Sequence, residues 1–89
     1  MIEVAFSSSF KRAFEKRIQH DKQIEDRFWH AVDIFIQNPF DRKLKTHRLS
    51  GKLKEVWSFR IDYDVRVLFY FISEKKVVFF DIGKHDEVY

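Results

Sequence analysis

The chain has 89 residues, 45% of them hydrophobic and 35% charged, which suffices for one compact domain and is too short for two. Eleven Phe, three Tyr and two Trp can bury much apolar surface, and the lack of cysteine excludes disulfide scaffolds, thiolate zinc sites and cysteine nucleophiles. The net charge of +3 does not by itself identify a nucleic-acid-binding protein. We interpret residues 1–89 as a single domain.

The sequence also bears on where the protein resides. No apolar stretch approaches the ~20 residues that cross a bilayer, and the first residues lack the basic and apolar segments of a secretion signal. The absence of cysteine agrees with a reducing compartment. We therefore expect a cytoplasmic protein that has no contact with membranes.

The first half of the chain predicts a strand followed by two helices. Apolar residues alternate from Ile2 to Phe6, as in a short strand. Serine hydroxyls at residues 7–9 can cap a first helix, and Asp21 can cap a second one, whose apolar residues recur at spacings of three and four. The pair Asn38-Pro39 predicts the end of the second helix.

The second half predicts three strands. Residues 55–62, 65–72 and 76–82 are rich in Val, Ile, Phe and Tyr, and short polar breaks separate them. Such breaks join antiparallel neighbours, because a parallel return needs a crossover of about a dozen residues. We predict an α+β fold with an N-terminal strand, two helices and a three-stranded antiparallel meander, the helices packing on one face of the sheet.

A basic segment, residues 42–54, joins the two halves. It contains six Lys or Arg residues and His47, and no acidic residue occurs until Glu55. One interpretation is a solvated loop. The other is a binding surface for phosphate groups.

Polar residues are expected to converge beside this segment. Strand alternation places Ser58 and Arg60 on one side of the first meander strand and Trp57 on the other. The helices should cover the Trp57 side, which leaves Arg60 on the opposite face. Because the basic segment enters this strand and residues 83–85 leave the last one, we expect a shared cleft. Its candidate residues are His47, Arg60, Arg66, His85 and Tyr89.

Each candidate also has a structural interpretation. His47 can be an ordinary loop histidine, and Tyr89 can be a frayed terminus. The arginines can form surface ion pairs: Arg60 with Asp62 or Asp81, and Arg66 with Asp64. His20 and His30 fall in predicted helices and are interpreted as structural.

The candidate set suits cleavage of RNA by attack of a ribose 2′-OH on the adjacent phosphate. This reaction needs a base for the 2′ proton, an acid for the 5′ leaving oxygen and cations around the phosphorane. Histidine can act as base or acid because its usual pKa is about 6.5, and arginine binds phosphate oxygens in pairs. No His, Asp or Glu set has the spacing of metal ligands, so we expect no metal ion and no cofactor.

Three local motifs occur in an order and spacing typical of one known family. They are HRLSG at residues 47–51, WSFRI at 57–61 followed by RVLFY at 66–70, and IGKHDEVY at 82–89. On these motifs the chain resembles, over essentially its whole length, the mRNA-interferase members of the RelE/ParE toxin superfamily, of the RelE, YoeB and YafQ types. The resemblance implies a ribosome-dependent endoribonuclease of a type II toxin–antitoxin system, which cuts mRNA and is neutralised by a cognate antitoxin.

The resemblance also implies roles for single residues. His47 is similar to a catalytic loop histidine, Arg66 to the arginine that stabilises the scissile phosphate with support from Arg60, and His85 to a general acid. Tyr89 is similar to an aromatic residue that stacks on or orients a base. YoeB-like members carry a carboxylate base that this loop lacks, so the base would be His47 or a lysine. The residues similar to those that hold RNA are Lys43, Lys45, Arg48, Lys52, Lys54 and Lys84.

Two other functions stay open at this point. One is a ParE-like inhibitor of DNA gyrase with the same fold, although such a poison has no need of the C-terminal histidine and tyrosine. The other is a catalytically degenerate homologue that only binds its antitoxin. In each case we expect the free chain to be a monomer and to form a hetero-oligomer with an antitoxin that covers the basic cleft or the helices.

Overall fold

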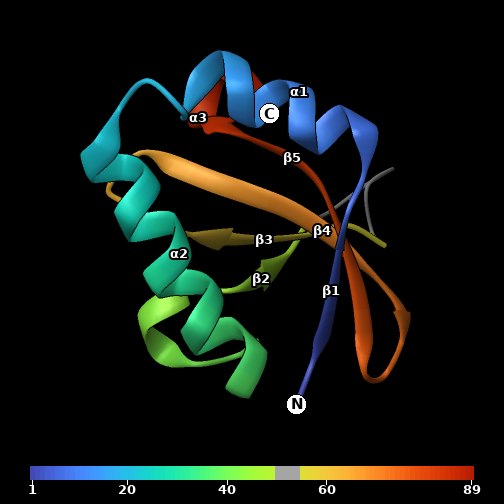
Figure 1. Ribbon diagram of the computed structural model, residues 1–89. Coiled ribbons are helices and arrows are strands. Elements are labelled where there is room, and N and C mark those ends of the chain that lie inside the picture. The colour runs from blue at the N-terminus through green and yellow to red at the C-terminus, as the bar shows by residue number, and fades with distance from the viewer. Residues whose placement is uncertain (50–54) are drawn as a thin grey trace.

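A five-stranded mixed sheet is the central element of the computed structural model, which describes residues 1–49 and 55–89 (Figure 1). The strands are β1 (Glu3–Phe6), β2 (His47–Arg48), β3 (Trp57–Arg60), β4 (Val65–Ser73) and β5 (Lys76–Lys84). The helices are α1 (Ser8–Arg17), α2 (Lys22–Gln37) and α3 (His85–Val88), with a short 3-10 helix, η1, at Arg42–Leu44. The strand order is β1-β5-β4-β3-β2, in which β1 runs parallel to β5 and the other neighbours are antiparallel.

Both long helices begin, and α2 also ends, where the sequence predicts. The Ser7 side chain accepts a hydrogen bond from the Phe10 amide (3.1 Å), and the Asp21 side chain accepts one from the Ile24 amide (3.2 Å). Asn38 is the C-cap of α2. Among the described residues, no helix is both long enough and apolar enough to span a bilayer.

The helices α1 and α2 pack on the same face of the sheet. The ring centroid of Phe35 in α2 lies 4.9 Å from that of Phe59 and 5.2 Å from that of Phe79. Phe10 in α1 lies 5.8 Å from the same Phe79 ring. All four rings are buried, and burying one such side chain stabilises a fold by roughly 1.5–3 kcal/mol. The helices thus cover the side of β3 that carries Trp57, as predicted.

The sheet is larger than the predicted meander, which is therefore only part of the fold. Strands β3, β4 and β5 are antiparallel neighbours, but β1 is added beside β5 and β2 beside β3. The β1–β5 pair joins opposite ends of the sequence, and β2 pairs only His47 with Ser58 and Arg48 with Trp57. A local sequence pattern can predict that residues 2–6 form a strand, but it does not predict which distant strand they pair with, and β2 is too short to show a pattern.

A bulge in β5 decides which of its residues face the helices. Leu68 pairs with Asp81 and Phe69 with Phe79, so one residue of β5, Phe80, has no partner in β4. Phe79 and Ile82 can therefore both lie in the core, although regular alternation would put them on opposite faces. After the bulge, Asp81 pairs with Leu68 and Gly83 pairs with Arg66, so both belong to the sheet face away from the helical core, and the long Arg17 side chain of α1 reaches Asp81 there.

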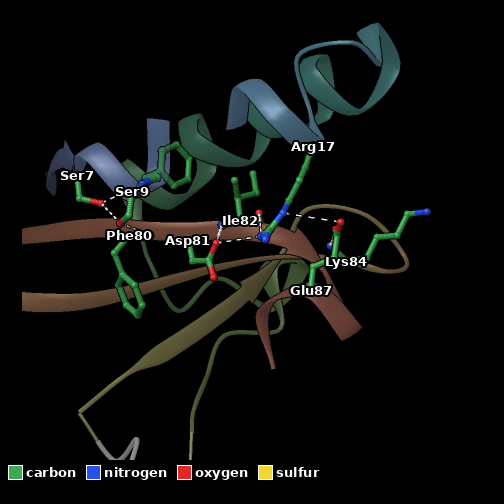
Figure 2. A network of polar contacts seen from close by, with 9 residues as sticks. Ser7, Ser9, Arg17, Phe80, Asp81, Ile82, Lys84 and Glu87 are labelled. Atoms are coloured by element: carbon green, nitrogen blue, oxygen red, sulfur yellow. Dashed lines mark hydrogen bonds and ion pairs between the residues drawn. The ribbon is translucent and has the colours of Figure 1, made fainter. Parts of the chain in front are cut away.

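Side chains of α1 occupy the edge of β5 beyond the end of β1. Strand β1 pairs only with residues 76–79. Further along, Ser9 Oγ donates a hydrogen bond to the Phe80 carbonyl (2.8 Å) and Arg17 Nη1 donates one to the Ile82 carbonyl (3.0 Å) (Figure 2). These bonds satisfy backbone groups that an edge strand leaves unpaired, and they hold α1 against β5.

Candidate functional site

The sheet face opposite α1 and α2, here called the site face, gathers side chains from three strands. In the register, His47 of β2 pairs with Ser58 of β3, and Arg60 of β3 pairs with Arg66 of β4. Cross-strand partners point to the same face with their Cβ atoms about 4.5–5.5 Å apart. Because Phe59 points into the core, its neighbours Ser58 and Arg60 point to the site face.

The short helix α3 brings two further candidates to this face. Its first amide, of His85, donates a hydrogen bond to the Asp64 carbonyl (3.0 Å). The Tyr89 hydroxyl donates one to Ser58 Oγ (2.5 Å), and the rings of His85 and Tyr89 lie 4.5 Å apart in an edge-to-face arrangement. Tyr89 is therefore docked rather than frayed.

Ser58 is a site-face residue to which the sequence assigned no role. Its side chain is fully buried, with 0% exposure, although it lies on the side away from the helical core. The Tyr89 hydroxyl is the partner of its Oγ atom. Strand alternation indicated which way Ser58 points, but no sequence signal indicated that a residue 31 positions later would bond to it.

The ion pairs considered for the two arginines are not formed. Asp62 instead pairs with Arg27 of α2, and Asp81 pairs with Arg17 of α1 at 3.2 Å. Arg66 Nη1 donates to backbone carbonyls of the β3–β4 turn, the shortest bond being 3.1 Å to Tyr63. Asp62 and Asp81 thus pair with arginines of the helices. The spacing of residues in the sequence does not indicate such long-range pairs.

Arg60 and Arg66 thus form a like-charged cross-strand pair. Among the described residues, neither guanidinium makes an ion pair with a carboxylate. Like charges directly opposite each other on a sheet destabilise it. The pair is suited to hold an anion, because arginine matches the geometry of phosphate oxygens.

The hydrogen bond of His47 determines which ring nitrogen is free. His47 is exposed, and its Nδ1 atom lies 3.2 Å from the Lys45 carbonyl oxygen. A carbonyl oxygen only accepts hydrogen bonds, so Nδ1 carries the proton of the neutral ring. The Nε2 lone pair is then available to accept a proton from a substrate. Lys45 itself adopts a left-handed conformation, with φ of 53°.

The remaining basic candidates lie on several elements, and Arg48 does not lie on the site face, contrary to the prediction. Lys43 and Lys45 are exposed on the segment before β2, and exposed Lys84 is the N-cap residue of α3. Arg48 pairs with Trp57 and its guanidinium lies 5.8 Å from the Trp57 ring centroid, on the other side of the sheet from His47. Two candidates, Lys52 and Lys54, lie outside the described residues, as do residues 50–51 of the HRLSG motif.

In the described parts of the chain, no three His, Asp or Glu side chains lie close enough together to hold a metal ion.

The chain matches one protein family over nearly its full length. Residues 2–89 match the model of the family described as YafQ, a bacterial toxin of a type II toxin–antitoxin system. The chain belongs to the YafQ toxin family. No curated protein matches it at a significant level.

Solved toxin structures share the fold of this YafQ-family chain. A mutant of YafQ from E. coli gives a TM-score of 0.80 at 15% identity, covering 100% of this chain and 99% of that one. The YoeB/ParE toxin from Agrobacterium tumefaciens gives 0.78 at 18% identity, covering 94% and 99%. A copper-bound mutant toxin from Helicobacter pylori gives 0.73 at 21% identity, covering 100% of both chains. The predicted resemblance to RelE-like toxins is confirmed, and the α+β fold is that of these toxins.

Proposed function

We propose that this YafQ-family chain is an mRNA interferase, a ribosome-dependent endoribonuclease that uses side chains of the site face. The observation that carries the proposal is the register that aligns His47 with Ser58 and Arg60 with Arg66, while Tyr89 bonds to the same Ser58. Proton-transfer groups and phosphate-binding groups thereby occupy one face. Such a combination is what cleavage by an internal 2′-OH requires.

In the proposed step, His47 Nε2 takes the proton of the ribose 2′-OH. The 2′ oxygen forms a bond to phosphorus, and the bond from phosphorus to the 5′ oxygen breaks. Protonated His85 gives its proton to this leaving oxygen, so the products are a 2′,3′-cyclic phosphate and a 5′-hydroxyl. Each proton transfer contributes roughly 100- to 10,000-fold to the rate. Because side chains move both protons, we expect no metal ion in the chemical step.

The arginines and the tyrosine have different proposed roles. Arg60 and Arg66 stabilise the charge that builds up on the phosphorane. Arg66 reaches the phosphate by giving up its bonds to the turn carbonyls, of which the shortest is 3.1 Å. Tyr89 is 44% exposed, and its ring can stack on a base. The basic residues around the site face hold neighbouring phosphates, as Lys and Arg commonly do.

The exposure of the site supports dependence on the ribosome. His47, Lys84 and His85 are all exposed, so this face has little with which to enclose and orient an RNA chain by itself. Correct placement of reacting groups can supply about 7–11 kcal/mol of a reaction barrier. We propose that the ribosome supplies much of this placement by presenting mRNA in a fixed conformation.

We further propose that an antitoxin protein neutralises the chain by covering the site face or the helices. YafQ of E. coli has been crystallised as a DinJ–YafQ complex, whose YafQ chain superposes on this one with a TM-score of 0.80. An acidic or amphipathic segment would complement the basic residues. Co-purification with the product of the adjacent gene tests this proposal, and absence of a complex at nanomolar concentrations would contradict it.

Cleavage of a defined mRNA on purified bacterial ribosomes, with the 5′ ends mapped, tests the enzymatic proposal. We expect His47→Ala and His85→Ala each to lower the cleavage rate by about 100- to 10,000-fold, and Arg66→Ala to lower it as well. His30→Ala is the matched control, because His30 is exposed on α2, away from the site face. Equal cleavage by all four variants would refute the assigned roles.

Inhibition of DNA supercoiling without any mRNA cleavage would favour a gyrase inhibitor, and antitoxin binding with neither activity would favour a degenerate homologue.

A further inference from the structure

Arg17, the C-terminal residue of α1, links three parts of the chain next to the site face. Its Nη1 atom lies 3.2 Å from Asp81 Oδ1 and 3.0 Å from the Ile82 carbonyl oxygen, both on β5. Its Nε atom lies 3.7 Å from Glu87 Oε2, on α3 (Figure 2). The Arg17 side chain is only 25% exposed, so these contacts are less screened by water than those of a surface ion pair.

Glu87 connects Arg17 to the start of α3. Its second carboxylate oxygen, Oε1, accepts a hydrogen bond from the Lys84 amide (2.7 Å). Helix α3 has four residues, and a helix of one turn is not stable without outside contacts, because its first turn fixes several backbone angles for one hydrogen bond. Glu87 therefore supports both the first turn of α3 and its attachment to Arg17.

Gly83 leaves room for this arrangement. A Cβ atom at this position would lie 2.9 Å from Glu87 Oε1 and 3.0 Å from Arg17 Nη1. Cβ atoms essentially never approach another atom to 2.9 Å, and 3.0 Å is closer than most Cβ contacts. The missing side chain at residue 83 thus allows the guanidinium and the carboxylate to meet directly above β5.

Helix α3, which the contact between Arg17 and Glu87 holds, carries two proposed functional residues. His85 and Tyr89 lie at the ends of α3, with their rings 4.5 Å apart. We infer that Arg17 is a positioning residue, which holds α3 through Glu87 so that the His85 and Tyr89 rings stay against the site face. Its effect on cleavage rests on the proposed function, whereas its effect on α3 does not.

A merely structural role for Arg17 is the alternative, because the same side chain also attaches α1 to β5. Three variants separate the two roles. Glu87→Gln removes the charge opposite Arg17 at a 39% exposed side chain and leaves the core untouched. Arg17→Gln removes the ion pairs with both Glu87 and Asp81. Asp81→Asn is the matched control, because it removes the ion pair between α1 and β5. In the wild-type chain Asp81 Oδ1 accepts a hydrogen bond from the Ile82 backbone N–H (2.9 Å), and the side-chain oxygen of asparagine can still accept it.

The test combines NMR of the free chain with ribosome-based kinetics. In Glu87→Gln and Arg17→Gln, we expect fast motion at the amides of residues 85–88 and loss of the ring-current shift that Tyr89 imposes on His85. We expect kcat to fall by up to about 100-fold with KM little changed, since a displacement of about 1 Å can cost that much. In Asp81→Asn, the α3 signals and kcat should stay at wild-type values even if the unfolding midpoint falls.

The outcomes distinguish this inference from the proposed function. Unchanged α3 signals in both Glu87→Gln and Arg17→Gln would overturn the positioning role, as would equal changes in Asp81→Asn. If the wild-type chain cuts no mRNA while both variants still release α3, the proposed function fails and the positioning role stands. Cleavage that depends on His85 but is unaffected by either variant would uphold the function and refute the inference.

Discussion

The Tyr89 hydroxyl donates a 2.5 Å hydrogen bond to Oγ of Ser58, whose side chain is completely buried. The two partners are in unequal surroundings, because 44% of Tyr89 is exposed. Water can replace the bond for Tyr89 but not for Ser58. The consequences of losing the bond therefore depend on which partner is changed.

We predict that Tyr89→Phe destabilises the fold more than Ser58→Ala does. Tyr89→Phe leaves a buried hydroxyl without a partner, which costs about 1–3 kcal/mol. Ser58→Ala loses only the net value of one hydrogen bond, about 0.5–1.5 kcal/mol. The double variant should lose less free energy of unfolding than the sum of the losses in the two single variants. Free energies of unfolding in urea give all three values.

Tyr63→Phe is the control for this series, because Tyr63 is 85% exposed, and its free energy of unfolding should change by less than about 0.5 kcal/mol. Strictly additive effects of Ser58→Ala and Tyr89→Phe would contradict the bond between them.

We expect Arg60→Gln to leave stability unchanged or raise it by about 0.2–1 kcal/mol, because it relieves the repulsion from Arg66 on the neighbouring strand. The same change should weaken binding to single-stranded RNA. If Arg60 contacts one phosphate, the plot of log affinity against log salt concentration should lose about 0.7 of its slope. Fluorescence anisotropy with a labelled oligonucleotide measures both affinity and slope.

Lys11→Gln provides the comparison, because Lys11 is exposed on α1 and should leave the salt slope unchanged. A clear loss of stability in Arg60→Gln would show that Arg60 has a favourable partner in the free protein, contrary to this prediction.

The neutral ring of His47 should carry its proton on Nδ1. The reason is its bond to the Lys45 carbonyl, at 3.2 Å, which can only accept. Long-range proton–nitrogen correlation spectra at alkaline pH identify the tautomer. His30, which has no ring hydrogen bond among the described contacts, should show a mixture of tautomers. An Nε2-protonated His47 would leave no lone pair on the nitrogen that we assign as the base.

Deletion of Phe80 should cost much less stability than insertion of one alanine between Asp81 and Ile82. Without Phe80, the residues Phe79, Asp81 and Ile82 follow one another in regular alternation and keep their pairing with β4, so Phe79 and Ile82, both 0% exposed, stay in the core. The inserted alanine turns Ile82 to the opposite face, and loss of one such side chain from a core costs about 2–5 kcal/mol. Circular dichroism during urea unfolding compares the two variants, and a deletion variant as unstable as the insertion variant would refute this role of the bulge.

Local patterns predicted the helices and the orientation of β3. Ser7 and Asp21 cap α1 and α2 as expected, because a capping residue and a helical spacing of apolar residues lie close together in the sequence. The placement of Arg60 on the face away from the helices needed only the two-residue period of a strand. These features depend on neighbours within one or two turns of chain.

The features that were missed depend on distant residues. Strand β2 has two residues and α3 has four, which is too short for any periodicity. The bulge at Phe80 interrupts the period that a strand prediction uses. The partner of Asp81 is Arg17, 64 residues away, and no spacing rule connects them. The sequence therefore indicated candidate residues for the site, and long-range contacts determine how these candidates are held.

The position of β5 in the sheet has a consequence for the synthesis of this chain. It follows the other strands in the sequence, yet it lies between β1 and β4 and contacts both α1 and α3. A nascent chain that stops before Lys76 has no partner for β1, no carbonyl at Ile82 for Arg17 and no α3. The proposed activity can therefore arise only after β5 and α3 have left the ribosome. Translation products that stop before Lys76 are expected to be harmless to the cell that makes them.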